Sequence, residues 1–191
     1  MKPYAPLLVA CLMAGLVAFP FIRNHTIGER GMPGAQIGGH FVLETSAGPL
    51  DTSALGKDLI LIYFGYTYCP DVCPTELARM AQVYEGLGRD RKRVSGLFVT
   101  VDPERDTVEA VTEYAQVFDP SFNGLTGDRV QIEQVMRQYQ VYAQRVGDDP
   151  DNYTVDHSSR IYVMDGDAKL MALFSMDTEI PVMIEQVRKF L

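Results

Sequence analysis

The stretch LILIYFGYTYCPDVCPTEL, residues 59–77, joins a continuous apolar run to two cysteines with the spacing C-x-x-x-C. The run Leu59–Phe64 shows no alternation of polar and apolar residues, which is typical of a central strand buried on both faces. An apolar pattern of helical period follows the cysteines, and a proline is well suited to the first position of a helix. The stretch therefore predicts a strand, a turn holding Cys69 and Cys73, and a helix that begins at Pro74, with Cys73 near its N-cap.

The remainder of the sequence contains more of these two patterns. Gly96–Val101 and Ile161–Met164 are further apolar runs, and the turn signal DGD at Asp165–Asp167 leads into Leu170–Phe174. Apolar residues at helical spacing predict four helices, over Leu77–Leu87, Val108–Phe118, Ile132–Tyr139 and Ile180–Leu191. A cysteine motif directly after a central strand, in this order of elements, predicts an α/β, thioredoxin-like fold with a central, mainly parallel sheet and flanking helices.

The N-terminal segment is apolar. Residues 5–22, APLLVACLMAGLVAFPFI, contain no charged side chain, and eighteen helical residues span roughly 27 Å, close to the thickness of a bilayer core. We expect residues 1–22 to form an N-terminal membrane helix or, alternatively, a signal peptide, although no clear A-x-A cleavage site follows. Residues 23–39 hold five glycines and no periodic pattern, which predicts a flexible tether. The compact domain is then expected over residues 40–191.

The composition argues against two classes of protein. At pH 7 the formal net charge is −8 and the pI is about 4.8, whereas a nucleic-acid-binding surface needs an excess of basic residues. Three cysteines in 191 residues are too few for the disulfide framework of a small secreted domain. We therefore expect neither a nucleic-acid partner nor a disulfide scaffold.

The position of Cys69 and Cys73 at a strand-to-helix turn points to chemistry of their thiols. Unpaired backbone N–H groups and the positive end of a helix dipole stabilise thiolates, the form that binds metals and attacks disulfides. Spacing alone does not separate a thiol-disulfide redox pair from a metal site. Redox proteins with a thioredoxin fold use C-x-x-C, and the additional residue here leaves room for an ion between the sulfurs.

A metal site needs a third ligand, and the sequence holds three histidines. His25 and His40 lie in or beside the predicted tether, whereas His157 directly precedes the third buried strand. In a thioredoxin-like domain, the loop that enters this strand faces the cysteine loop. Two thiolates and one imidazole form a soft ligand set that favours copper, especially Cu(I) in trigonal geometry, while zinc normally requires a fourth ligand. The candidate metal ligands are therefore Cys69, Cys73 and His157, with a cysteine redox pair as the alternative.

Four segments of the sequence resemble the Sco/SenC family of copper proteins. They are YFGYTYCPDVCPTEL (63–77), LFVTVDPERDT (97–107), GLTG (124–127) and VDHS (155–158), in the family's order and spacing. The resemblance extends over about residues 37–191 and implies a thioredoxin-like domain that binds one copper ion, as Cu(I), Cu(II) or both. The chain departs from the family at the residue before the first cysteine, which is tyrosine here and histidine in many members.

The resemblance also implies ligands, a function and partners. Cys69, Cys73 and His157 match the family's copper ligands. The family serves assembly of the copper centres of cytochrome c oxidase, chiefly CuA, by delivering copper, by reducing the target's cysteines, or both. We therefore expect a copper metallochaperone tethered to the bacterial inner membrane with its soluble domain in the periplasm, or a thiol-disulfide oxidoreductase in which Cys69 and Cys73 cycle. The expected partners are the copper-bearing oxidase subunit and a copper donor or thiol reductase.

Acidic residues adjoin the candidate ligands. Asp71 and Asp156 could tune the charge of the site or orient His157. Because neighbours in an extended segment point in opposite directions, we expect Asp156 to serve its loop rather than the imidazole. The segment DPERDT, residues 102–107, is expected to form a turn and the cap of the next helix, with no chemical role.

Overall fold

The computed structural model describes residues 36–149 and 152–191. The predicted membrane segment 1–22 and residues 23–35 of the predicted tether lie outside the described residues. Within the part that is described, no helix is both long and apolar enough to cross a membrane. The compact unit runs from Gln36 to Leu191 and is built on one central sheet with helices on both faces.

The central sheet has five strands in the order β5-β4-β3-β8-β9. Their bounds are Asn123–Leu125 (β5), Val94–Thr100 (β4), Leu59–Gly65 (β3), Ile161–Asp165 (β8) and Leu170–Phe174 (β9). The strands β3, β4 and β5 are parallel to one another, β8 is antiparallel to β3, and β9 is antiparallel to β8. The thioredoxin-like plan and the predicted turn between β8 and β9 are confirmed.

The prediction of a mainly parallel sheet is wrong, because the sheet is mixed. The strand β8 starts beside the carboxyl end of β3, where Ile161 pairs with Tyr63, and runs back to pair Asp165 with Leu59. A short turn then leads into β9, and two strands joined in this way are antiparallel. The apolar run of β8 was informative about burial only, since a strand covered on both faces has the same pattern in either direction.

Two of the four α-helices, α1 (Val72–Leu87) and α2 (Val108–Phe118), pack on one face of the sheet, and α4 (Ile180–Phe190) packs against α1. The remaining helix is α3 (Arg129–Gln138). On β4, Gly96 lies against the Tyr84 hydroxyl of α1, and Phe98 packs on Tyr114 of α2. Because residues two apart on a strand point to the same face, α1 and α2 cover one face, as right-handed crossovers between parallel strands require. Ile184 of α4 packs against Gly86 of α1.

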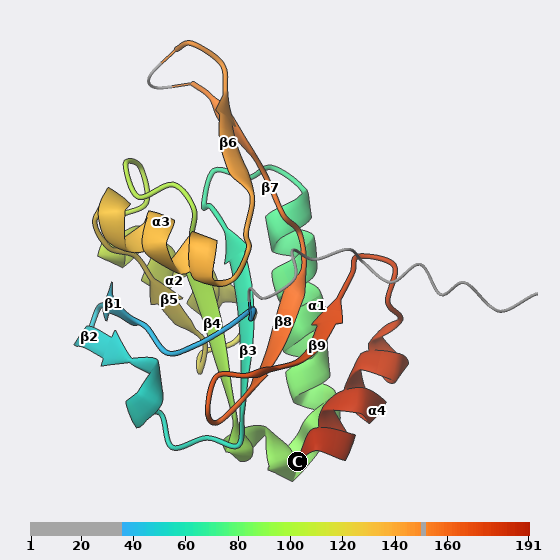
Figure 1. The fold of residues 1–191 in the computed structure, drawn as a ribbon. Coiled ribbons are helices and arrows are strands. Elements are labelled where there is room, and N and C mark those ends of the chain that lie inside the picture. The colour runs from blue at the N-terminus through green and yellow to red at the C-terminus, as the bar shows by residue number, and fades with distance from the viewer. Residues whose placement is uncertain (1–35, 150–151) are drawn as a thin grey trace, which may run out of the picture. The chain divides into compact units, whose positions relative to one another are not determined.

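The other face of the sheet is covered by the region of α3. Phe64 of β3 packs on Tyr139, which follows α3, and both rings contact Tyr162 of β8. Asp128 caps α3 in a capping box with Gln131. All four predicted helices are present in this arrangement, so the central strands are buried on both faces, as their apolar sequences predicted (Figure 1).

The start of α1 differs from the prediction. The helix begins at Val72 with Asp71 as its N-cap, so that Cys73 is the second helical residue and Pro74 the third. The predicted start at Pro74 is wrong because the N–H groups throughout the first turn lack intrahelical partners, and a proline is therefore tolerated beyond the first position. The consequence is that Cys73 lies inside the first turn of the helix.

Two hairpins outside the central sheet were not predicted from the sequence. One pairs β1 (Val42–Thr45) with β2 (Gly48–Asp51), and the other pairs β6 (Ala143–Val146) with β7 (Thr154–His157). Each hairpin is a two-stranded sheet of its own. The β6–β7 hairpin extends beyond the central sheet at the end where β3 leads into α1 (Figure 1).

Candidate metal centre

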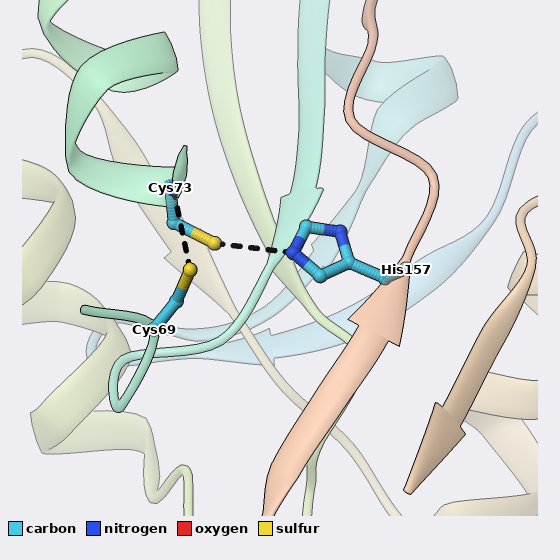
Figure 2. A group of neighbouring side chains, drawn as sticks. All are labelled: Cys69, Cys73 and His157. Carbon is cyan, nitrogen blue, oxygen red and sulfur yellow. Dashed lines mark hydrogen bonds between the residues drawn. The ribbon is translucent and has the colours of Figure 1, made fainter. Parts of the chain in front are cut away.

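The two cysteines lie where β3 gives way to α1. The N–H of Cys69 donates to the carbonyl of Tyr66, 3.2 Å away, which closes a turn after the strand. The N–H of Cys73, in the first turn of α1, donates to the Cys69 sulfur at 3.4 Å (Figure 2). One sulfur therefore accepts a hydrogen bond at the positive end of a helix, where backbone groups stabilise negative charge. Both cysteines are free thiols, Cys73 buried and Cys69 partly exposed.

His157 reaches this turn from the end of β7. Its Nε2 lies 3.3 Å from the Cys73 sulfur, and its Nδ1 lies 3.1 Å from the carbonyl oxygen of Ser158. Because a carbonyl can only accept, Nδ1 carries the proton and Nε2 keeps a lone pair directed toward the cysteines. A hydrogen bond of this kind, from the second ring nitrogen to a backbone carbonyl, is the usual way in which a metal-binding histidine is oriented.

The three residues that the sequence singled out lie together in the structure. The Cys69 sulfur, the Cys73 sulfur and a ring nitrogen of His157 all lie within 4.8 Å of one another (Figure 2). Three donors bound at roughly 2.0–2.3 Å to one ion in a trigonal plane lie roughly 4 Å apart, so this spacing fits a single metal ion. Two sulfurs and one imidazole nitrogen are a soft ligand set, which suits Cu(I).

The groups around the two cysteines keep Cys69 as a thiolate and Cys73 as a protonated thiol. A hydrogen bond from the Cys73 thiol, with further bonds from the backbone, lowers the pKa of Cys69 to about 3. The same sulfur–sulfur hydrogen bond, together with burial, raises the pKa of Cys73. The pair therefore shares one proton, held on the buried sulfur, and presents a thiolate at the more exposed one.

A glycine makes the space that the buried sulfur occupies. A Cβ atom on Gly65 would come 2.8 Å from the Cys73 sulfur and 3.0 Å from Cε1 of Tyr63. The Tyr63 ring is fully buried, and among the described residues its hydroxyl has no hydrogen-bond partner. Because Gly65, the last residue of β3, has no side chain, it leaves the space that the Cys73 sulfur occupies.

The segment after β4 supports the turn that carries the cysteines, a role that was not predicted from the sequence. Asp106 is buried, and its carboxylate accepts from the Thr67 N–H at 3.1 Å, the Thr67 hydroxyl at 2.6 Å and the Thr100 hydroxyl at 2.6 Å. The carboxylate thereby holds the start of the cysteine turn against β4. Burial raises the pKa of Asp106. The predicted helix cap is present as well, since the Thr107 hydroxyl accepts from the N–H of Ala110.

One signal in the sequence could have revealed this role of Asp106. The carboxyl ends of the parallel strands β3 and β4 meet at one edge of the sheet, and the acidic segment 102–107 follows β4 as directly as the cysteines follow β3. Asp156, in contrast, is exposed on β7, as expected for a residue that serves its own segment. Asp71 is the N-cap of α1 but makes no side-chain capping bond.

The fold and this cluster define a thioredoxin-like protein with a cysteine–cysteine–histidine cluster that could hold a metal ion. The SCO1/SenC family model matches residues 29–191. The chain therefore belongs to the SCO1/SenC family, and the resemblance noted in its sequence is confirmed.

Relatives of known name agree with this membership. The chain is 37% identical over 193 residues to an SCO2-like protein of Rickettsia conorii, covering 95% of this chain and 94% of that protein. It is 40% identical over 146 residues to the mitochondrial SCO1 homolog of Homo sapiens, covering 74% of this chain and 48% of that protein.

Solved structures show the same fold. The structure of Bradyrhizobium japonicum ScoI with copper bound is similar with a TM-score of 0.74 and 38% identity, over 81% of this chain and 99% of that chain. Yeast Sco1 with copper bound is similar with a TM-score of 0.73 and 30% identity, over 81% of this chain and 87% of that chain.

Proposed function

We propose that this chain binds one copper ion through Cys69, Cys73 and His157 and supplies it during assembly of cytochrome c oxidase. The observation that carries the proposal is the convergence of two sulfurs and an imidazole nitrogen within 4.8 Å of one another. The copper-bound structures of relatives that are 38% and 30% identical to this chain support copper as the metal.

Each of the three residues has a distinct task in holding copper. Cys69 supplies a preformed thiolate, because its pKa is lowered to about 3. Cys73 must release its proton before it can act as a second thiolate, and His157 completes the set through Nε2. Two thiolates with Cu(I) carry one net negative charge, and with Cu(II) they are neutral, so the site suits both oxidation states. The partly exposed position of Cys69 gives a partner access to the ion.

The proposed cellular role extends this binding activity. Because the family serves the assembly of cytochrome c oxidase, we propose that the copper-bearing oxidase subunit receives the copper ion at its CuA centre. The apolar segment 5–22 supports tethering to the bacterial inner membrane, with the described domain on the periplasmic side. A copper donor or a thiol reductase would be needed upstream, since a disulfide between Cys69 and Cys73 cannot bind Cu(I).

A titration of the reduced full chain with Cu(I), against a chromophoric Cu(I) chelator, tests the proposal. We expect one copper per chain and a loss of binding in Cys69→Ser and Cys73→Ser. His157→Ala should weaken affinity about 10- to 100-fold, while His40→Ala, whose ring contacts Thr52 instead, should bind like the wild type. With Cu(II), a thiolate charge-transfer band should be present and should disappear in either cysteine variant. Unchanged copper affinity in His157→Ala would contradict the proposed site.

The second candidate function is a thiol-disulfide oxidoreductase acting on the oxidase copper site or on other exported proteins. The low pKa of Cys69 beside a buried thiol favours it, because a partly exposed thiolate can attack disulfides while its neighbour resolves the mixed disulfide. His157 separates the two functions. Reduction of a disulfide substrate that persists in His157→Ala, in a chain that retains no copper, would favour this second function.

A further inference from the structure

The third ligand is carried by a part of the fold that does not belong to the central sheet. His157 is the last residue of β7, where it pairs with Ala143 of β6. The described strands β6 and β7 pair with each other and with none of the central strands. Backbone pairing to the sheet begins again only at Ile161 of β8, four residues after His157, so other contacts are needed to hold the hairpin that carries the imidazole.

Arg105, in the segment between β4 and α2, contacts residues of both segments that carry the proposed ligands. Its Nε donates to Asp102 at 2.6 Å, and its Nη1 donates to the carbonyl of Tyr153 at 3.0 Å. The guanidinium carbon lies 3.5 Å from the centroid of the Tyr153 ring, which precedes β7, and 4.7 Å from that of Tyr68, which precedes Cys69. One cation thus stacks against an aromatic ring from each of the two segments that carry ligands.

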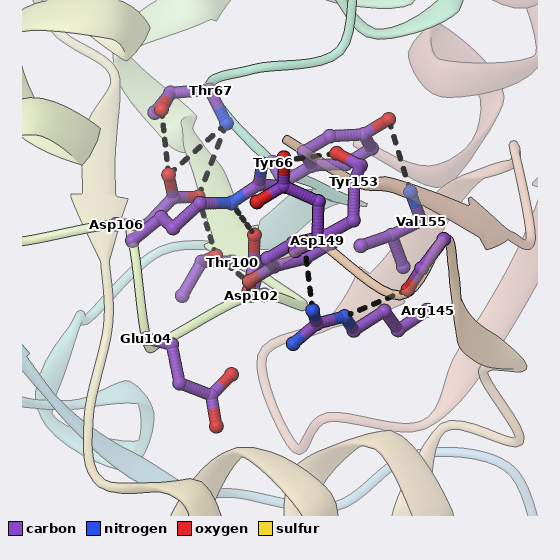
Figure 3. Close-up of polar contacts among 12 residues, drawn as sticks. Tyr66, Thr67, Thr100, Asp102, Glu104, Asp106, Arg145, Asp149, Tyr153 and Val155 are labelled. Carbon is purple, nitrogen blue, oxygen red and sulfur yellow. Dashed lines mark hydrogen bonds and ion pairs between the residues drawn. The ribbon is translucent and has the colours of Figure 1, made fainter. Parts of the chain in front are cut away.

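Two further hydrogen bonds attach the same part of the hairpin. The Tyr153 hydroxyl donates to Asp102 at 2.6 Å, and the N–H of Val155 donates to the Tyr66 hydroxyl at 3.2 Å (Figure 3). Asp102, Arg105, Tyr153 and Tyr66, which we call the Arg105 network, therefore tie β7 to the cysteine turn two to four residues before His157.

The Arg105 network is buried, which makes it sensitive to small changes. The side chains of Arg105 and Asp102 are 12% and 3% exposed. In such surroundings loss of either partner of the ion pair leaves an uncompensated charge, and Nη2 of Arg105 already has no hydrogen-bond partner among the described residues. The guanidinium combines two directed hydrogen bonds with a flat face for stacking, and a lysine ammonium cannot reproduce that combination.

We propose that Arg105 is a positioning residue for the metal centre, which holds the β6–β7 hairpin on the cysteine turn and thereby sets the place of the His157 imidazole. The inference rests on the proposed copper site. It predicts that Arg105 affects copper binding only through His157, although the two side chains belong to different elements.

A double-mutant cycle with Cu(I) affinity of the full chain as readout tests this role. Arg105→Lys should lower affinity about tenfold in the wild-type background, the lower end of the effect of residues that support metal ligands. In the His157→Ala background the same substitution should change affinity less than about twofold, because the ligand it positions is absent. Tyr153→Phe, which removes only the hydroxyl bonded to Asp102, should show the same pattern with a smaller loss. Arg105→Lys retains the charge and Tyr153→Phe retains the ring, so we expect both variants to fold.

Arg91→Lys is the matched control. Arg91 also pairs with a carboxylate, Asp119 at 2.7 Å, and stacks over a tyrosine, Tyr84 at 5.6 Å, but it does so in the 3-10 helix that precedes β4. It should leave copper affinity unchanged. In the metal-free protein, Arg105→Lys should also speed hydrogen exchange of the Val155 N–H about tenfold, which Arg91→Lys should not.

The outcomes separate this inference from the proposed function. A wild-type chain that retains no copper would overturn the proposed function. A wild-type chain that binds one copper, combined with an Arg105→Lys variant of equal affinity, would overturn the positioning role alone. Equal losses from Arg105→Lys with and without His157 would likewise overturn it, because they would reflect a general loss of structure.

Discussion

Replacing Gly65 by alanine adds only one methyl group, but we expect this substitution to distort the metal centre. The new Cβ would lie 2.8 Å from the Cys73 sulfur, 3.0 Å from Cε1 of Tyr63 and 3.1 Å from Cε2 of Phe98. All three neighbours are fully buried, so none can turn out to solvent. The backbone at Gly65 accepts an L-residue, and the effect of the substitution is therefore one of space.

The expected magnitude follows from these contacts. Carbon and sulfur at 2.8 Å must separate by about 0.6 Å or more to reach ordinary van der Waals contact, and functional groups tolerate about 0.5 Å of displacement. Overfilling a packed core costs about 1–3 kcal/mol of stability. We expect Gly65→Ala to lose that much stability in the metal-free state and, in addition, to bind Cu(I) about tenfold more weakly, because the sulfur of one ligand is displaced.

Gly96→Ala is the control for overfilling alone. Its Cβ would lie 2.4 Å from Cδ1 of Phe122, on the same face of the sheet but away from the cysteines. Urea unfolding of the metal-free proteins should show comparable losses of stability for the two variants. Cu(I) competition should show weaker binding for Gly65→Ala only. Wild-type copper affinity in Gly65→Ala, or an equal loss in Gly96→Ala, would refute the reasoning.

Two further predictions concern titratable groups. Because the pKa of Cys69 is lowered to about 3, the rate of its alkylation by iodoacetamide in the metal-free protein should stay nearly constant from about pH 8 down to pH 5. The alkylation of an ordinary cysteine slows about tenfold per pH unit over the same range. Peptide mass spectrometry that found such slowing at Cys69, or equal labelling of Cys73, would contradict the assignment. Arg79→Met should destabilise the domain by about 3–5 kcal/mol near neutral pH, because it leaves the buried carboxylate of Glu76, 1% exposed and 2.8 Å from Arg79, without its partner. Burial already raises the pKa of Glu76, so protonation should shrink this loss as the pH falls, and a loss in urea unfolding that does not depend on pH would count against the pairing.

Much of the central layer was predictable because burial leaves a pattern in the sequence. The run Leu59–Phe64, within the fully buried β3, was predicted as a strand from its apolar residues, Leu170–Phe174 from the turn signal before it, and α2 from its helical spacing. The direction of β8 was not predictable, since a strand covered on both faces reads the same either way. The strand β6 escaped detection for the opposite reason: its residues Ala143–Val146 are largely exposed and carry no periodic signal.

The three residues of the candidate centre were easier to find in the sequence than the residues that support them. Cysteine and histidine are scarce in this chain, so their chemistry limits the possible partners of Cys69 to very few. Arg105 is one of many charged residues, and its role depends on a contact with Tyr153, which lies 48 positions further along the chain. No local spacing encodes such a contact, because it arises only when the hairpin folds back on the segment that follows β4.

The sequence separation within the centre also has a consequence for the time at which it forms. Cys73 and His157 lie 84 positions apart, and the strand that follows His157 must join β3 before the imidazole reaches the sulfurs. During synthesis the N-terminal part of the chain emerges first, so both thiols are exposed long before His157 has been made. An oxidant present at that stage can react with the unprotected pair. An ion held by all three side chains binds only the finished domain and stabilises it by mass action, so tight retention of the metal reports that folding is complete.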